Sequence, residues 1–225
     1  MAFIAKVDYF GLEGAALDCT ASNDGKSASV AEAKGNDGSI VAHEVYGEQL
    51  SPSCDYQLIA AWTSADDALA LGTVKATDGA SVCLGEITIN TSAGSAPTIS
   101  ASGEQVEQGA TADCTYKLPG FALPKTHHAQ ILFDCATLGG DGCHLTAANY
   151  TMTCSISKAT VEGVCVTHDV TEGKIEAALT IVQTGTAVPT LTAGEGWTIT
   201  APLAGSNPDA DYPTFSATLT KYLAK

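Results

Sequence analysis

The chain has 225 residues, with ten Lys, no Arg and 25 Asp and Glu residues, which gives a formal net charge of −15. This charge disfavours sequence-specific nucleic-acid binding, because affinity for a phosphate backbone comes largely from basic side chains that displace counterions. The chain has no Arg, whose planar guanidinium group commonly binds carboxylates and phosphates through two hydrogen bonds, so an anionic substrate is disfavoured as well. The length exceeds one ordinary domain of about 100–150 residues and suffices for two domains, each with its own core.

The amino terminus, MAFIAKVDYFGLEG, carries Lys6 and Asp8 inside its apolar stretch. No long hydrophobic segment comes before them, so the sequence predicts neither a signal peptide nor a membrane helix. We therefore expect no membrane association and no export by a signal-peptide route.

Strands are predicted where apolar and polar residues alternate with a period of two. The clearest strand is 149–157, where Thr and Ser alternate with Tyr150, Met152, Cys154 and Ile156. One side of this strand is expected to face a core and the other to face solvent or a partner. Similar patterns and β-forming composition predict the strands 55–63, 86–91, 149–157, 174–183, 196–201 and 214–222. The only helix candidate is Thr126 to Leu138, whose apolar residues have helical spacing, although its alignment with 39–47 favours a strand.

Glycine-containing turn signals separate these runs. Asp-Gly readily supplies the positive backbone dihedral angles that a tight hairpin needs. Short strands at this spacing, with little helix, predict an all-β fold made of antiparallel sandwiches or barrels. The signals are Asn23-Asp24-Gly25, Asn36-Asp37-Gly38, Asp78-Gly79, Gly139-Gly140-Asp141-Gly142 and Glu172-Gly173.

Four landmarks of the first half return in the same order in the second half, and their offset falls only from 95 to 92 residues. This register predicts an internal duplication with two tandem β domains, 1–105 and 106–225, that meet near 100–111. Asp18-Cys19-Thr20 returns as Asp113-Cys114-Thr115, Asp55-Tyr56 as Asn149-Tyr150, Ile87-Thr88-Ile89 as Leu179-Thr180-Ile181, and Pro97-Thr98-Ile99 as Pro189-Thr190-Leu191.

Only Cys19 and Cys114, of eight cysteines, occupy equivalent positions in the two halves. A disulfide framework of an ancestral domain would have been duplicated with it, so the pattern favours free, mostly buried thiols. Two local disulfides, Cys135 with Cys143 and Cys154 with Cys165, remain as alternatives.

No group of residues has the spacing of a metal site. His127, His128, Cys135, Cys143 and His144 are of types that bind zinc, but they contain no Cys-x-x-Cys or His-x3-His pair. Cys143 and His144 would also point to opposite faces of a strand. We expect ordinary packed or surface residues, with no metal and no other cofactor.

Catalytic motifs are missing as well. A glycosidase needs two carboxylates opposed across a cleft, whereas Asp66-Asp67, Glu104 and Glu107 are interpreted as solvated surface acids. The sequence contains no nucleophile elbow, Walker loop or Rossmann glycine fingerprint, so we expect no enzyme and no catalytic residues.

Two further patterns have ordinary explanations. Asn90-Thr91-Ser92 and Asn149-Tyr150-Thr151 match the glycosylation acceptor pattern, and we interpret both as chance matches because no export signal precedes them. Trp62 and Trp197 lie in strand-like alternation, which favours core or inter-sheet anchors over platforms for stacking sugars.

The chain combines two tandem β modules and the lack of an export signal with two further segments. One is a hairpin segment reading EAKGNDGSIVAHEVYGE, and the other is a second half running from HHAQILFDCATLGGDG to NPDADYPTFSATLTKYL. In this combination the chain resembles bacteriophage virion structural proteins of the tail-tube kind. The resemblance implies β-sandwich units that pair edge to edge into stacked homo-oligomeric rings, with duplicated versions forming a ring from half as many chains. Its implied location is the virion, after assembly in the host cytoplasm, and its implied partners are copies of itself and other virion proteins.

An acidic lumen would repel DNA and let it slide, which agrees with the charge of −15. Capsid decoration proteins and head–tail connectors reuse similar small β domains, and the sequence assigns no interface residues among these possibilities. The alternative interpretation is an extracellular adhesive or ligand-binding module resembling bacterial immunoglobulin-like repeats. A third, an esterase or metal-dependent hydrolase, has no motif to support it.

Overall fold

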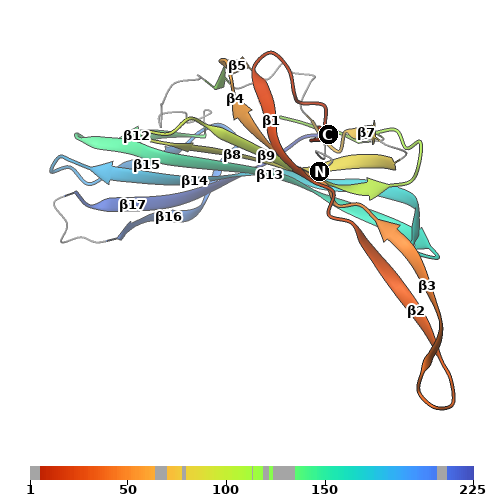
Figure 1. Ribbon diagram of the computed structural model, residues 1–225. Coiled ribbons are helices and arrows are strands. Elements are labelled where there is room, and N and C mark those ends of the chain that lie inside the picture. The colour runs from red at the N-terminus through yellow and green to blue at the C-terminus, as the bar shows by residue number, and fades with distance from the viewer. Residues whose placement is uncertain are drawn as a thin grey trace.

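A computed structural model describes residues 6–63, 70–77, 80–112, 114–118, 122–123, 135–206 and 212–225 (Figure 1). These residues form seventeen strands and no helix, so the predicted all-β class is confirmed. Accordingly, the described ranges contain no helix that is long and apolar enough to cross a membrane.

One large antiparallel sheet forms the body of the molecule. Eight strands lie side by side in the order β1-β4-β9-β8-β13-β14-β17-β16, and β7 also pairs with β8. Strand β8 pairs with β13, so strands from both halves of the sequence belong to one continuous sheet. The strands are β1 (Leu17–Asn23), β4 (Ser53–Leu58), β7 (Val74–Thr77), β8 (Ala80–Ser92), β9 (Thr98–Val106), β13 (Cys143–Val161), β14 (Val164–Gln183), β16 (Thr198–Ser206) and β17 (Thr214–Tyr222).

Four two-stranded ladders accompany the large sheet. They pair β2 (Ser27–Lys34) with β3 (Ile40–Gln49), β5 (Trp62–Thr63) with β11 (Ala122–Leu123), β6 (Ala70–Leu71) with β10 (Tyr116–Lys117), and β12 (Ala136–Gly139) with β15 (Thr190–Ala193). Leu71 of β6 and Tyr116 of β10 belong to the hydrophobic core, so these short strands help to cover the apolar face of the large sheet. The β2–β3 hairpin instead projects away from the body (Figure 1).

Cross-strand rows explain why the large sheet has one apolar face. Successive side chains of a strand point to opposite faces, so every second row across the sheet faces the core. The members of one such row are at most 2 % exposed. This row is Cys19, Tyr56, Ile99, Ile89, Tyr150, Ala177 and Leu219, each opposite the next.

Most predicted strands are confirmed. The runs 86–91, 149–157 and 174–183 lie within β8, β13 and β14, and 214–222 coincides with β17. The run 196–201 starts two residues early, because β16 begins at Thr198. The prediction for 55–63 is wrong beyond Leu58, where the chain bends at Ile59 and Ala60 before the two residues of β5.

The turn predicted at Glu172-Gly173 is wrong. Strand β14 continues through these residues, and they form a bulge opposite β13 in which Glu172 has a φ of 57°. The tight turn between β13 and β14 is Glu162-Gly163, where both residues have positive φ, as a type I′ hairpin requires.

The other described turn signals lie between strands or begin at the last residue of a strand. Asn36-Asp37-Gly38 lies between β2 and β3. The signal at 139–142 begins at the end of β12 and leads to β13, and Asn23-Asp24-Gly25 begins at the end of β1 and leads toward β2. Asp78-Gly79 lies outside the described residues. Residues 126–134 of the helix candidate also lie outside them. Its described end is not helical, because Ala136 to Leu138 belong to β12, so the strand interpretation is correct there.

The internal duplication and the boundary near 105 stay predictions. Asp55-Tyr56 and Asn149-Tyr150 lie in β4 and β13, and Ile87 and Leu179 lie in β8 and β14. Strands β13 and β14 are direct neighbours, whereas β9 separates β4 from β8. Asp113 of the first landmark lies outside the described residues.

All eight cysteines are free thiols in the structure. Cys19, Cys54, Cys83 and Cys135 are buried, and the other four are half-buried. Neither of the alternative local disulfides is formed.

Replacing Gly103 by Ala should destabilise the protein by roughly 1–3 kcal/mol, the usual cost of overpacking a core. An added Cβ would overlap the carbonyl oxygen of Cys83 and lie 2.9 Å from Cε1 of Phe10. Urea denaturation would measure the loss, and Gly14→Ala is the control because no atom lies within 4 Å of its added Cβ. Equal stability of the two variants would contradict the packing described.

Candidate assembly surfaces

The residues that resemble metal ligands do not come together. Cys135 is buried, with its Sγ 3.8 Å from the hydroxyl of Tyr150, while Cys143 packs against the core and the neighbouring His144 is exposed. His127 and His128 lie outside the described residues. Among the His, Cys, Asp and Glu residues that are described, no group of three is placed to hold a metal ion.

Two of the acids are paired. Glu104 lies 2.6 Å from Nζ of Lys158, and Glu107 lies 2.9 Å from Nδ1 of His168. The interpretation as a solvated surface acid is wrong for Glu107, whose side chain is only 26 % exposed and faces a buried imidazole. Asp66-Asp67 lie outside the described residues.

The tryptophans are packed. Trp197 is 8 % exposed and belongs to the core, and Trp62 is half-buried against it. Asn90 and Asn149 lie opposite each other on β8 and β13, so the two glycosylation patterns meet in the middle of the large sheet.

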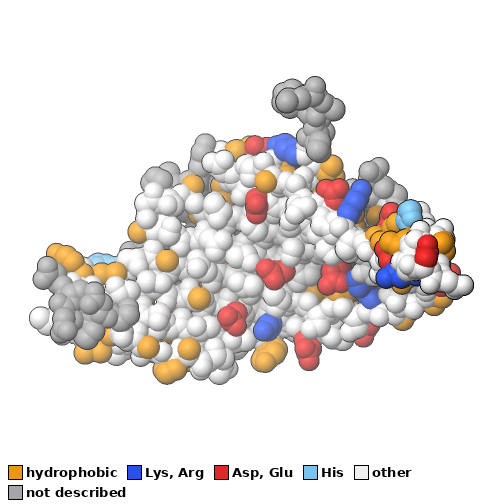
Figure 2. All heavy atoms as spheres, turned by 60° about the horizontal axis from the view of Figure 1, so that its bottom comes forward, with side chains coloured by type: hydrophobic (Ala, Val, Ile, Leu, Met, Phe, Trp, Pro, Cys, Tyr) orange, Lys and Arg blue, Asp and Glu red, His pale blue; other side chains and the backbone are white. Residues whose placement is uncertain are grey.

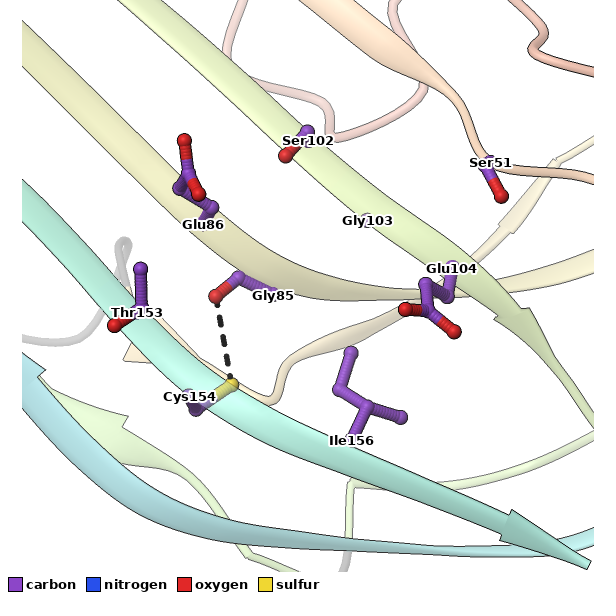
Figure 3. Close-up of a pocket in the computed structure, with 9 residues that line it drawn as sticks. All are labelled: Ser51, Gly85, Glu86, Ser102, Gly103, Glu104, Thr153, Cys154 and Ile156. Atoms are coloured by element: carbon purple, nitrogen blue, oxygen red, sulfur yellow. Dashed lines mark hydrogen bonds between the residues drawn. The ribbon is translucent and has the colours of Figure 1, made fainter.

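A cleft beside Glu104 is lined mainly by residues of β8, β9 and β13 (Figure 3). It has a volume of about 330 Å³ and contains Glu86, Glu104 and Cys154. The thiol of Cys154 points to the carbonyl oxygen of Gly85, 3.7 Å away, and burial raises its pKa to about 11. A thiol with this pKa is protonated at neutral pH, so Cys154 lacks the thiolate that a nucleophile needs.

The β2–β3 hairpin, residues 27–49, is called the arm here. Its turn is built by Asn36-Asp37-Gly38: Gly38 has a φ of 82°, and Asp37 Oδ1 accepts hydrogen bonds from the backbone N–H and the hydroxyl of Ser39. All residues of β2 are exposed, and in β3 only Gly47 and Gln49 are half-buried. The arm therefore receives almost no cover from the rest of the described chain.

Apolar side chains occupy both faces of the arm. Val30 and Val45 are direct cross-strand partners on one face and are 55 % and 52 % exposed. Ile40, opposite Lys34 beyond a bulge, lies on the same face and is 55 % exposed, whereas Tyr46, opposite Ser29, lies on the other face and is 45 % exposed. A long exposed strand pair with apolar residues is a template for pairing with another chain, and such surfaces on soluble proteins mark interaction sites.

The large sheet has two open edges, β1 and β16, each of which has a single strand neighbour among the described residues. All seven junctions along the sheet are antiparallel, so β1 and β16 run in opposite directions. The unpaired N–H and C=O groups of such edges can be satisfied by the edge of a neighbouring subunit.

The face of the sheet opposite the core, called the polar face here, carries hydroxyl, amide and acidic side chains. One row across it is Asp55, Ser100, Thr88, Thr151, Glu176 and Thr220, each opposite the next. In the view of Figure 2, most of the surface is white, the colour of the backbone and of side chains that are neither hydrophobic nor charged, with separate carboxylates and fewer lysines. The row contains two carboxylates and no lysine, which disfavours binding of nucleic acid there.

No family model matches the sequence, and no curated protein matches it.

Acid should destabilise the protein partly through Glu107. Burial alone would raise the pKa of this carboxyl group, but hydrogen bonds from its own backbone N–H, His168 and Cys165 outweigh burial and lower the pKa. A lowered pKa stabilises the fold above the unfolded value of about 4.3 and loses that contribution as the pH falls through the folded value.

The test compares urea midpoints of the wild type and Glu107→Gln between neutral and acid pH. The advantage of the wild type should be complete above about pH 5 and should shrink below about pH 4. His168→Gln should weaken this pH dependence. A constant difference between wild type and Glu107→Gln over the whole range would refute the assignment.

Proposed function

We propose that the chain is a non-enzymatic structural protein that assembles with copies of itself into a phage virion, as rings of a tail tube. The observation that carries the proposal is the arm, whose apolar side chains are exposed on both faces. Such a surface is costly to leave in water, and burying it against another subunit would remove that cost.

The edges of the large sheet support a ring. Because β1 and β16 run in opposite directions, β1 of one subunit placed beside β16 of the next continues the antiparallel order. In this arrangement the two edges supply contacts within a ring, and the arm supplies contacts to a neighbouring ring. The duplication of the sequence into two β modules would let each chain fill two positions of the ring.

The polar face supports a lumen through which DNA passes. Asp55, Glu86 and Glu176 project from it and Lys174 is exposed beside them, in a chain with a formal charge of −15. Negative charge opposes binding to phosphates, and a surface of hydroxyl groups without arginine binds phosphates only weakly. DNA would therefore slide past this face.

Electron microscopy and light scattering of the purified chain over a range of concentrations test the proposal. We expect rings or stacked tubes that become more abundant as concentration rises, because assembly depends on mass action. A monodisperse monomer at every concentration would contradict the proposal and favour the adhesive-module alternative. Isolated closed rings without stacking would support the edge contacts and oppose the role given to the arm.

A further inference from the structure

The β13–β14 hairpin extends beyond the large sheet. Pairing with β8 stops at Thr153, and pairing of β14 with β17 begins only at Lys174. Residues 155–171, called the hairpin end here, therefore pair only with each other in the strand ladders. The bulge at Glu172-Gly173 lies where the hairpin leaves the sheet, and bulges bend and twist a strand.

Two side-chain pairs, one an ion pair and one a carboxylate–imidazole hydrogen bond, hold the hairpin end against the end of β9 and the residue that follows it. Lys158 and His168 are cross-strand partners, and they bind Glu104 and Glu107 at 2.6 Å and 2.9 Å. The side chain of His168 is 1 % exposed and that of Lys158 is 16 % exposed. The glutamates are the more exposed partners, at 45 % for Glu104 and 26 % for Glu107, so separation costs mainly the polar partner of the largely buried Lys158 and His168.

The arm is fastened to the same end of β9. The backbone N–H of Leu50 donates to Oε1 of Gln105 at 3.0 Å, and the N–H of Gln105 donates to the carbonyl oxygen of Leu50 at 2.8 Å. Gln105 lies between the two paired glutamates, so residues 104–107, at the end of β9 and just beyond it, hold both the arm and the hairpin end.

The arm also rests on the turn of the hairpin. Gly47 of β3 meets Gly163 backbone to backbone, and a Cβ added to Gly163 would overlap Cα of Gly47. Both glycines have positive φ, 63° and 79°, which favours glycine at both places. A cavity of about 240 Å³, lined by Gln49, Gln105, Val106 and Cys165, remains beside this contact.

We propose that the Glu104–Lys158 and Glu107–His168 pairs form a latch that holds the hairpin end against β9, so that Gly163 supports the base of the arm and fixes its direction. When the latch opens, the hairpin end lifts and the arm pivots about residues 49–51. This movement takes place within a single chain and does not depend on assembly.

The test measures the direction of the arm in single molecules of the full chain. Spin labels on non-natural residues introduced at Ser39 and Ser92 report the distance from the arm turn to the large sheet, and dilution with unlabelled protein keeps the distance intramolecular. Hydrogen exchange of 155–171 reports whether the hairpin end has opened. The latch variant is Lys158→Met with His168→Gln, and the control is Lys26→Met, which removes an exposed ion pair with Asp24.

In the latch variant we expect exchange of the hairpin end to rise at least about tenfold and the distance distribution to broaden, whereas Lys26→Met should change neither. A released hairpin end with an unchanged distance distribution would overturn the proposal, as would a hairpin end that stays protected. Gly163→Ala provides a second variant, because it should shift the arm while both latch pairs remain. An unchanged arm in a folded Gly163→Ala protein would also overturn the proposal.

Discussion

The double substitution Val30→Asp/Val45→Asp should leave the chain folded and able to form single rings, but unable to stack them into tubes at concentrations at which the wild type does. The two side chains face each other across β2 and β3 and are more than half exposed, so the monomer has no packing there to lose. In an interface, each new carboxylate would be taken out of water without a partner, at a cost of several kcal/mol per ion. Light scattering and electron microscopy measure assembly, and circular dichroism measures folding.

Val188→Asp is the matched control. Val188 is 71 % exposed and lies in the connection between β14 and β15, outside the arm and both sheet edges. It introduces one carboxylate of the same kind at an exposed valine, so assembly should persist. If the control assembles and the arm variant assembles equally well, the arm is not the contact between rings.

Tyr150→Ala should cost about 3–5 kcal/mol of unfolding free energy, the usual range for removing a large aromatic side chain from a core. Tyr150 is fully buried and pairs with Ile89 of β8 and Ala177 of β14 in the central apolar row. Typical domains are stable by only about 5–15 kcal/mol, so much of the stability should disappear. For a chain of this size the melting temperature should fall by roughly 10 °C.

The control for this substitution is Tyr222→Ala, because Tyr222 lies near the end of β17 and is 76 % exposed. Urea denaturation should place it within about 0.5 kcal/mol of the wild type, as for most surface changes. Similar losses for the two tyrosines would mean that Tyr150 is not in the core of the sheet.

The local alternation of apolar and polar residues was sufficient to predict the central strands. In 149–157 the alternation of Tyr150 and Met152 with threonines matches their burial, because both neighbouring strands keep the same two-residue period. The turn prediction failed at Glu172-Gly173. A dipeptide of the same sequence closes a hairpin at Glu162-Gly163 but forms a bulge at Glu172-Gly173. The difference depends on where β13 and β17 pair with β14, which no short window contains.

The candidate surfaces were predictable only in part. Asn36-Asp37-Gly38 indicates a hairpin, but the exposure of Val30 and Val45 depends on how the chain leaves the body at Gly47 and Leu50. The Glu107–His168 pair joins residues 61 positions apart, and it follows from the way the hairpin end folds across β9. Neither arrangement leaves a signal in composition or spacing.

The opposite directions of β1 and β16 also decide how large an assembly can become. Two copies that joined the same edge, β1 to β1, would be related by a two-fold axis and would stop at a dimer. Joining unlike edges leaves one β1 and one β16 free after every addition, so growth is head to tail. Such growth ends only when the rotation between successive copies brings the last subunit back to the first, and the angle at this one junction then sets the circumference.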